Sequence, residues 1–146
     1  MKSIAIVLTL LILLTGCSKE KDYYGGITQD KVPDLNDSKL ENVHEFKGHN
    51  DNWGAIMYVA KYKGSEKMFT RTIGIYNGKD PKPKGDFKIL VDNIAGSSTT
   101  TFKQPPDEGI YMFLTGSPST PPTSDTIVTL VLQTKEKSEK IELKMD

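Results

Sequence analysis

The sequence has 146 residues, with 19 basic and 19 acidic side chains, so its formal net charge at pH 7 is zero. That balance gives no electrostatic basis for binding nucleic acid, and the length suits one ordinary domain. A single cysteine excludes a disulfide within the chain, so the fold must rest on its hydrophobic core.

The N-terminus carries an apolar run that follows one basic residue. Residues 4–14 are apolar except for Thr9 and come directly after Met1-Lys2-Ser3. A helix that spans a bilayer needs about 20 apolar residues, so this run is too short to span. A basic start, a short apolar stretch and then small residues predict a secretory signal peptide over residues 1–16.

The tetrapeptide Leu14-Thr15-Gly16-Cys17 resembles the lipobox of bacterial lipoproteins. The resemblance implies that the Cys17 thiolate takes a diacylglyceryl group and becomes the mature N-terminus. It also implies a protein held in the bilayer through acylated Cys17, on the extracytoplasmic face of the cell membrane. The alternative is a chance cysteine after an ordinary signal peptide. Ser18 does not distinguish a plasma membrane from an outer membrane.

Residues 17–38 are polar, with Gly25-Gly26 and Pro33 among them and few aliphatic side chains. Such a composition buries too little apolar surface to offset the cost of ordering the chain. We therefore expect a flexible tether here. The alternative for Tyr23 and Tyr24 is a contact with the membrane interface or with the domain.

From Lys39 onward, short strand-like runs alternate with turn signals. The run at 53–62 is almost continuously apolar and predicts a central strand buried on both faces, whereas the mixed run at 39–48 predicts an edge strand. The expected strands are 39–48, 53–62, 67–76, 86–92, 97–103, 110–116, 126–134 and 139–145.

Seven or eight strands with this spacing predict an all-β fold, an immunoglobulin-like antiparallel β-sandwich over residues 39–146. The cysteine pair of true immunoglobulin domains is absent. The expected core consists of Trp53, Ile56, Tyr58, Phe69, Ile73, Ile75, Phe87, Ile89, Ile110, Met112, Leu130, Leu132, Ile141 and Leu143.

Two short segments, Gly48-His-Asn-Asp-Asn-Trp53 and Glu139-Lys-Ile-Glu-Leu-Lys144, are loosely similar to small uncharacterised surface lipoproteins of Gram-positive bacteria. That resemblance implies no catalytic residues.

The two histidines offer one route to chemistry. His44 and His49 are five positions apart, with Glu45 and Asp51 nearby. Zinc needs three or four such ligands brought together, so a metal-binding protein or a small metal-assisted hydrolase is the alternative function. The other interpretation is one edge-strand histidine and one solvated loop histidine.

Other catalytic patterns are missing from the sequence. It contains no G-x-S-x-G elbow, and the small-residue stretch 95–101 lacks the Gly-Lys-Ser/Thr ending of a phosphate loop. The favoured function is therefore a non-catalytic binding or accessory module at the cell envelope, with no cofactor. Its partner is expected to be an envelope protein or polymer and no nucleic acid. A structural lipoprotein without a ligand is the third reading.

Loops held on a rigid scaffold are where binding residues tend to lie. Because consecutive strands alternate in direction, the loops at 48–52, 77–85, 104–108 and 135–138 should gather at one end, which we expect to point away from the tether. The candidate binding residues in these loops are His49, Asp51, Lys79, Lys82 and Lys84. A solvated hairpin loop is the other interpretation of the three lysines.

Overall fold

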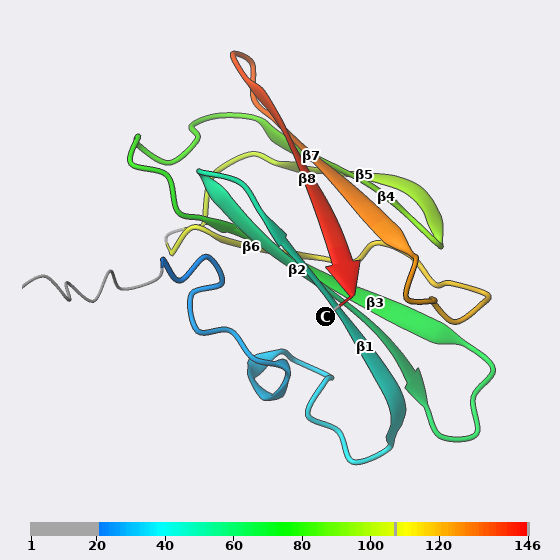
Figure 1. Ribbon diagram of the computed structural model, residues 1–146. Coiled ribbons are helices and arrows are strands. Elements are labelled where there is room, and N and C mark those ends of the chain that lie inside the picture. The colour runs from blue at the N-terminus through cyan, green and yellow to red at the C-terminus, as the bar shows by residue number, and fades with distance from the viewer. Residues whose placement is uncertain (1–20, 107, 146) are drawn as a thin grey trace, which may run out of the picture.

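The computed structural model describes residues 21–106 and 108–145. In this part of the chain a turn of 3-10 helix, η1 (Gln29–Lys31), precedes eight strands (Figure 1). In chain order the strands are β1 (Leu40–His49), β2 (Trp53–Tyr62), β3 (Met68–Tyr76), β4 (Phe87–Asn93), β5 (Gly96–Phe102), β6 (Ile110–Phe113), β7 (Ile127–Gln133) and β8 (Ser138–Met145). Every expected strand is present, with ends that shift by three residues at most.

All neighbouring strands pair antiparallel, in the order β5-β4-β7-β8-β1-β2-β3-β6. The predicted all-β antiparallel fold is therefore confirmed, and the hydrogen bonding joins its strands into one sheet. The link between β8 and β1 is narrow, because it consists of the two pairs Phe46–Met145 and Lys47–Lys144.

The sheet curls into a nearly closed, barrel-like roll. Figure 1 shows the half containing β4, β5, β7 and β8 lying across the half containing β1, β2, β3 and β6. The two edge strands approach each other through aromatic rings, since the centroid of Phe102 on β5 lies 5.1 Å from that of Tyr111 and 6.2 Å from that of Phe113 on β6. The main core fills the space between the two halves.

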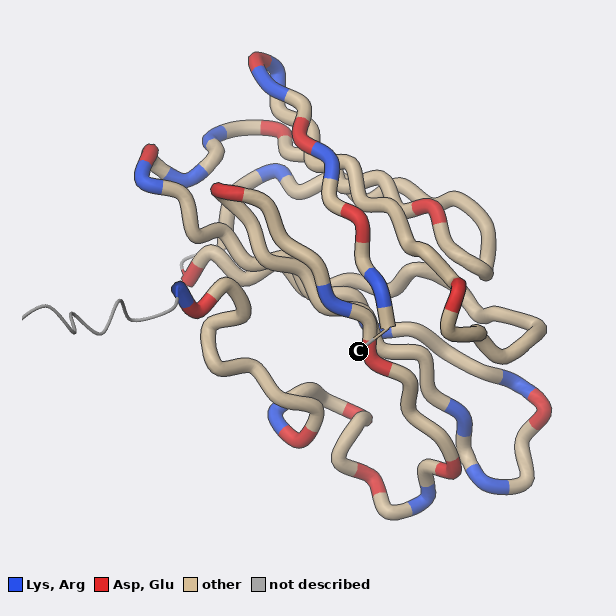
Figure 2. The backbone as a smooth tube through the Cα atoms, viewed as in Figure 1, with Lys and Arg blue, Asp and Glu red and all other residues tan. Residues whose placement is uncertain are grey.

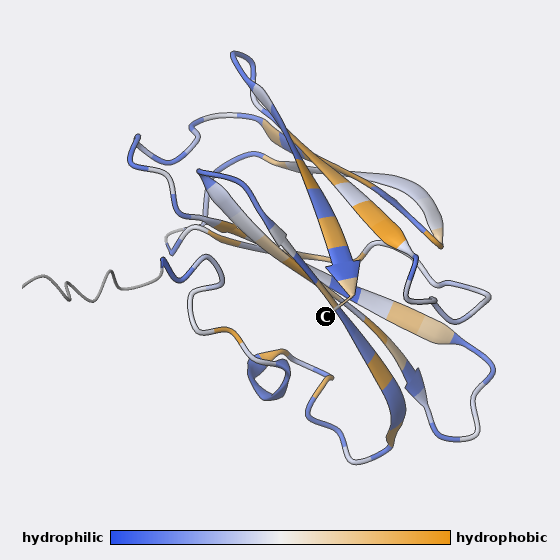
Figure 3. Ribbon diagram, in the orientation of Figure 1, coloured by the Kyte–Doolittle hydropathy of each residue, from blue (hydrophilic) through white to orange (hydrophobic). Residues whose placement is uncertain are grey.

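Burial follows the sequence pattern of each strand. In β8 inward apolar residues alternate with outward polar ones, as Figure 3 shows. In β7 the inward residues are Val128, Leu130 and Leu132, and the outward positions mix apolar and polar side chains. Strand β2 is instead buried on both faces over Trp53–Ala60, as its continuous apolar run predicts. One face, including Met57, joins the main core, and the other, including Ile56 and Tyr58, joins a second cluster on the outside of the roll.

The second cluster is completed by residues 21–38, which the composition predicts to be a flexible tether. Val32 and Leu35 are each 1% exposed and pack against β2 and β3. Figures 1 and 3 show this segment running under that half of the sheet, with apolar patches near η1. The tether prediction is thus wrong for its described part, because a few apolar side chains suffice to cover a strand pair that is itself apolar on its outer face. Residues 17–20 lie outside the described part.

Polar contacts fix the same segment along its length. Arg71 forms an ion pair with Asp34, and the Gln29 side chain donates to the Leu35 carbonyl at 3.1 Å. At the other end of the segment the Tyr23 carbonyl accepts from Asn77 Nδ2 at 2.6 Å. Gly54 permits this approach, since a Cβ there would lie 1.9 Å from the Tyr23 carbonyl oxygen. The alternative that Tyr23 docks on the domain is confirmed.

Two further expectations need correction. Strand β1 is not an edge strand, because it lies between β8 and β2. Met112 is 43% exposed, whereas Tyr111 is fully buried in the main core. In β6 adjacent residues point to opposite faces, so a uniformly apolar run does not reveal which alternate set points inward. Of the other expected core residues, Phe69 and Ile110 are partly buried against the second cluster and the rest are buried.

Candidate functional site

The two ends of the roll differ in how they are closed. At the end where β3 begins and β4 finishes, the buried hydroxyl of Thr115 lies 2.8 Å from that of Thr70 and 2.9 Å from that of Thr72. Asn93 donates to the Thr115 carbonyl at 3.2 Å, and Thr70 donates to the Gly116 carbonyl at 3.0 Å. These bonds seal this end with a polar network that leaves its own hydroxyls paired.

At the opposite end, the loops between strands are joined by short hydrogen bonds. The side-chain oxygen of Asn50 accepts from the backbone N–H groups of Asn52 and Trp53, both at 2.9 Å. The Asn77 N–H donates to the Asn52 carbonyl at 2.6 Å, and Asn52 Nδ2 donates to Glu139 Oε1 at 2.8 Å. The β1–β2 turn is thereby tied to the start of the β3–β4 loop and to β8, so the expected gathering of these loops is confirmed.

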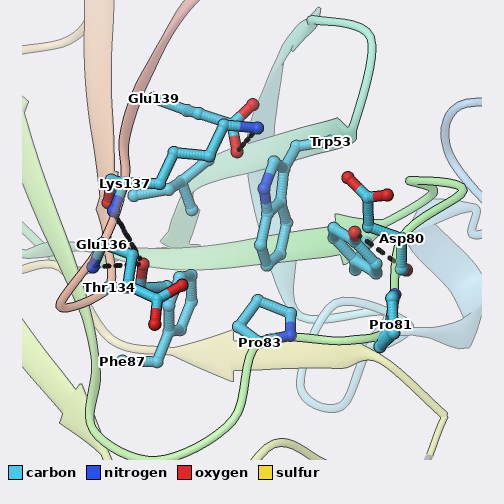
Figure 4. A pocket seen from close by; sticks show the side chains of 11 residues that line it. Trp53, Asp80, Pro81, Pro83, Phe87, Thr134, Glu136, Lys137 and Glu139 are labelled. Atoms are coloured by element: carbon cyan, nitrogen blue, oxygen red, sulfur yellow. Dashed lines mark hydrogen bonds and ion pairs between the residues drawn. The ribbon is translucent and has the colours of Figure 1, made fainter.

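A pocket of about 190 Å³ opens at this loop end, between the β3–β4 loop and the β7–β8 hairpin (Figure 4). We call it the Trp53 pocket. It is lined by Trp53, Tyr76, Asp80, Pro81, Pro83, Phe87, Leu132, Thr134, Glu136, Lys137 and Glu139. Figure 2 shows that both loops beside it carry charges of both signs.

Trp53 forms the inner wall of the pocket. Its indole lies parallel to Phe87 with centroids 5.1 Å apart and meets Tyr76 edge-on at 4.9 Å, so the ring is held firmly and is only 1% exposed. Its backbone N–H is bonded to Asn50 Oδ1, and its indole N–H is not one of the buried unpaired donors among residues 21–106 and 108–145. Figure 4 shows this nitrogen on the edge of the ring that faces Glu139 and Lys137. A donor that opens into a pocket is a group with which a ligand can form a hydrogen bond.

Carboxylates surround the mouth of the pocket. Asp80 lies on the loop side and Glu136 and Glu139 lie on the hairpin side, as Figure 4 shows. Glu139 pairs with Lys137 at 3.1 Å, the lysine being the one cation among the lining residues. Burial raises the pKa of the Tyr76 hydroxyl, and the nearby Asp80 and Glu139 carboxylates raise it further. The lining therefore carries an excess of negative charge.

The predicted binding residues lie at this end but outside the pocket. His49 stacks on Tyr23 with ring centroids 3.8 Å apart, and the Asp51 carbonyl accepts from the Lys21 ammonium at 2.8 Å. Lys79, Lys82 and Lys84 alternate along the β3–β4 loop with the residues that do line the pocket. The loop contributes Asp80, Pro81 and Pro83 rather than its lysines.

The N-terminal segment also reaches the loop end, so the expectation that this end points away from the segment is wrong. β1 does begin at the threonine-sealed end, but the segment before it runs back along the outside of the sheet. Lys21, the first described residue, therefore lies beside Asp51 at the loop end. The loops expected to point away from the N-terminal segment are the loops next to it.

Sequence reasoning placed the 135–138 loop at this end but did not single out the residues of the hairpin that line the pocket. Glu136, Lys137 and Glu139 had no distinguishing pattern, because charged residues are common in any solvated turn. Trp53 was expected in the core, where it lies. Pro81 and Pro83 could have indicated the loop side of the pocket, because proline rings in a charged loop supply rigid apolar surface.

The structure does not bring the two histidines together. His44 shares the inward face of Phe46, whereas His49 lies an odd number of residues away, on the outer face beside Tyr23. Among the described residues no group of three or more His, Cys, Asp and Glu side chains is placed to hold a metal ion. Cys17 and its lipobox lie outside the described residues.

Comparisons with protein-family models, with curated proteins and with solved structures find no match. The site must therefore be interpreted from its own chemistry. Within the described part of the chain, no helix has the length and apolar character needed to cross a membrane.

The hydroxyl of Tyr111 yields a first prediction, because it is buried and has no hydrogen-bond partner in the described structure. An unpaired buried hydroxyl costs about 1–3 kcal/mol, so Tyr111→Phe should leave the free energy of unfolding unchanged or raise it by about 1 kcal/mol in urea titrations at pH 7. A loss of more than about 1 kcal/mol would mean that the hydroxyl is bonded.

The same variant should change the alkaline response. Burial raises the pKa of Tyr111 to about 12, whereas an unfolded tyrosine titrates near 10. The unfolded state therefore loses its proton first, and stability falls as the pH rises from about 10 to about 12. Tyr111→Phe should lose less stability over this range than the unmodified chain does, although Tyr58, whose pKa burial also raises, will keep part of the loss.

Proposed function

We propose that this chain is a lipid-anchored lipoprotein on the extracytoplasmic face of the cell membrane, acting as a non-catalytic binding or accessory module. Its partner, an envelope protein or polymer, docks at the loop end. The observation that carries the proposal is the Trp53 pocket, where a buried tryptophan ring turns its N–H edge toward an open site lined by three carboxylates. At the opposite end the hydroxyls of Thr70, Thr72 and Thr115 are paired with one another.

The membrane part of the proposal rests on the sequence. The apolar run, the small residues and Cys17 follow one another in the order that a lipoprotein precursor requires. Two acyl chains hold a protein stably where one binds marginally, at about 0.8 kcal/mol per buried CH₂. Acylation of Cys17 would thus be a sufficient anchor by itself.

The proposal includes a finer description of the fold, in which the two halves serve as the layers of an immunoglobulin-like sandwich. In its support, the halves face each other over one shared core and are joined by two residue pairs. Such a scaffold holds its end loops rigidly, which suits a binding module.

Lipid attachment is tested by Cys17→Ala. Metabolic labelling with a palmitate analogue should mark the unmodified chain and leave the variant unlabelled, because the thiol is the acceptor. The variant should also accumulate as the uncleaved precursor or leave the membrane fraction. Ser18→Ala is the matched control and should label normally. A Cys17→Ala chain that matures and stays membrane-bound contradicts the anchor.

Docking at the loop end is tested by site-specific photo-crosslinking in membranes of cells that make the protein. A photoreactive residue at Pro81, on the pocket rim, should give a discrete adduct, and one at Ser119, exposed at the threonine-sealed end, should not. Adducts from Ser119 alone would place the functional surface at the threonine-sealed end and contradict the proposal.

A further inference from the structure

The size of the Trp53 pocket limits what can enter it. Sites for small molecules and cofactors usually enclose about 300–1,000 Å³. At about 190 Å³ the pocket is smaller than that range and suits a single long side chain. Its occupant is therefore a projecting group of a larger partner.

The lining selects the chemistry of that group. The floor is apolar, with Phe87 and Leu132 from neighbouring strands and Pro83 from the loop. Above it stand three carboxylates and one ammonium, and that ammonium is already paired with Glu139. An apolar stem that ends in a positive charge matches this order, since lysine and arginine place their methylenes on apolar surface and their charge among acidic groups.

The geometry of Trp53 separates this occupant from a sugar ring. Sugars stack on an open aromatic face, but the Trp53 ring is 1% exposed and one face is covered by Phe87. What the indole presents to the pocket is its N–H edge, which calls for an acceptor such as a peptide carbonyl.

We propose that the Trp53 pocket receives a lysine or arginine side chain of a protein partner, with its charge among Asp80, Glu136 and Glu139 and a neighbouring backbone carbonyl accepting from the Trp53 indole. The inference rests on the proposed function, because it names the partner class of the same site. It makes the partner a protein with an exposed basic residue.

The chain contains one tryptophan, so its emission and its indole NMR signal report on this site alone. The probes are the capped tripeptides Ala-Lys-Ala, Ala-Arg-Ala and Ala-norleucine-Ala, added to the full chain in detergent micelles. The lysine and arginine peptides should shift both Trp53 signals to saturation. The norleucine peptide, which keeps the stem and lacks the charge, should bind at least about tenfold more weakly.

Variants then locate the charge. Asp80→Asn and Glu136→Gln should each weaken the lysine peptide about tenfold, and added salt should weaken it in the unmodified chain. Asp125→Asn, a matched loss of charge beside the threonine-sealed end, should bind as the unmodified chain does. Unchanged melting temperatures show that the exposed carboxylates act on binding and not on folding.

Each of the following results would overturn the inference. Equal binding of the lysine and norleucine peptides would make the site simply apolar. A shift of the Trp53 signals by chitooligosaccharides and not by peptides would make the partner a glycan polymer. Loss of adducts from Pro81 would instead remove the proposed function itself, whereas Pro81 adducts without any response to the basic peptides would leave that function standing and reject only the basic side chain.

Discussion

Truncation of Leu35 to alanine is expected to lower the free energy of unfolding by about 2–5 kcal/mol, as much as truncation within a strand. Leu35 is 1% exposed, and with Val32 it covers the outer faces of β2 and β3. Removing its methyl groups leaves a cavity in the cluster that Leu35 shares with Tyr58 and Ile73, and we expect little collapse because both of these belong to strands held by the main core. Urea titration followed by Trp53 fluorescence measures the change.

The matched control is Asn36→Ala, the next residue along the same segment. Asn36 is exposed, so its replacement should change stability by no more than about 0.5 kcal/mol. If Leu35→Ala has an equally small effect, the segment is the loose tether that its composition suggests, and the second cluster contributes nothing to the fold.

Trp53→Ala should be still more damaging, at about 3–5 kcal/mol. The indole stacks on Phe87 and contacts Tyr76 and Tyr111, so one substitution removes the common neighbour of three aromatic rings. The chain has no disulfide to limit the consequences, and domains of this size are typically stable by about 5–15 kcal/mol. Circular dichroism melting should show a large decrease in midpoint.

Met112→Ala provides the contrast, since a uniformly apolar sequence run gave Met112 the same expectation of burial as Trp53. Its side chain is 43% exposed on the outer face of β6, so the substitution should change stability by about 0.5 kcal/mol or less. A loss comparable with that of Trp53→Ala would show that β6 is turned the other way, with Met112 inside and Tyr111 outside.

The strands were predictable because each carries its own pattern. The alternation in β4 and β8 shows which side faces the core, and the unbroken apolar run of β2 indicates two covered faces. What local pattern does not specify is which strand lies beside which. The position of β1 in the interior of the sheet depends on its short pairing with β8, a contact between residues almost a hundred positions apart.

The docking of the N-terminal segment could not be predicted from its average composition. The segment is polar on average, but burial is decided by single side chains, and Val32 and Leu35 pack against the apolar outer face of β2 and β3. The apolar outer face of β2 was itself the missing clue, because something in the chain had to lie against it.

The sequence predicts at which end of the fold the candidate site lies, but not which residues line it. Alternating strand directions bring the right loops together, but a loop sequence does not show which of its side chains turn inward. Lys79, Lys82 and Lys84 were therefore preferred to Asp80, Pro81 and Pro83, which line the pocket. The 135–138 loop was expected at the same end, but nothing in its sequence distinguished Glu136 and Glu139 from other charged turn residues.

The docked N-terminal segment also limits how far the domain can rise above a bilayer. On the proposed anchor, residues 18–20 are all that separate Cys17 from Lys21, which is held at the loop end by the Asp51 carbonyl. A fully extended chain advances about 3.3–3.6 Å per residue, so the connection from Cys17 to Lys21 reaches at most about 14 Å. The headgroup layer alone takes up about 5–7 Å of that distance. The Trp53 pocket would then lie low over the lipid, and a partner would approach it sideways, from another protein in the same membrane, rather than from the medium above.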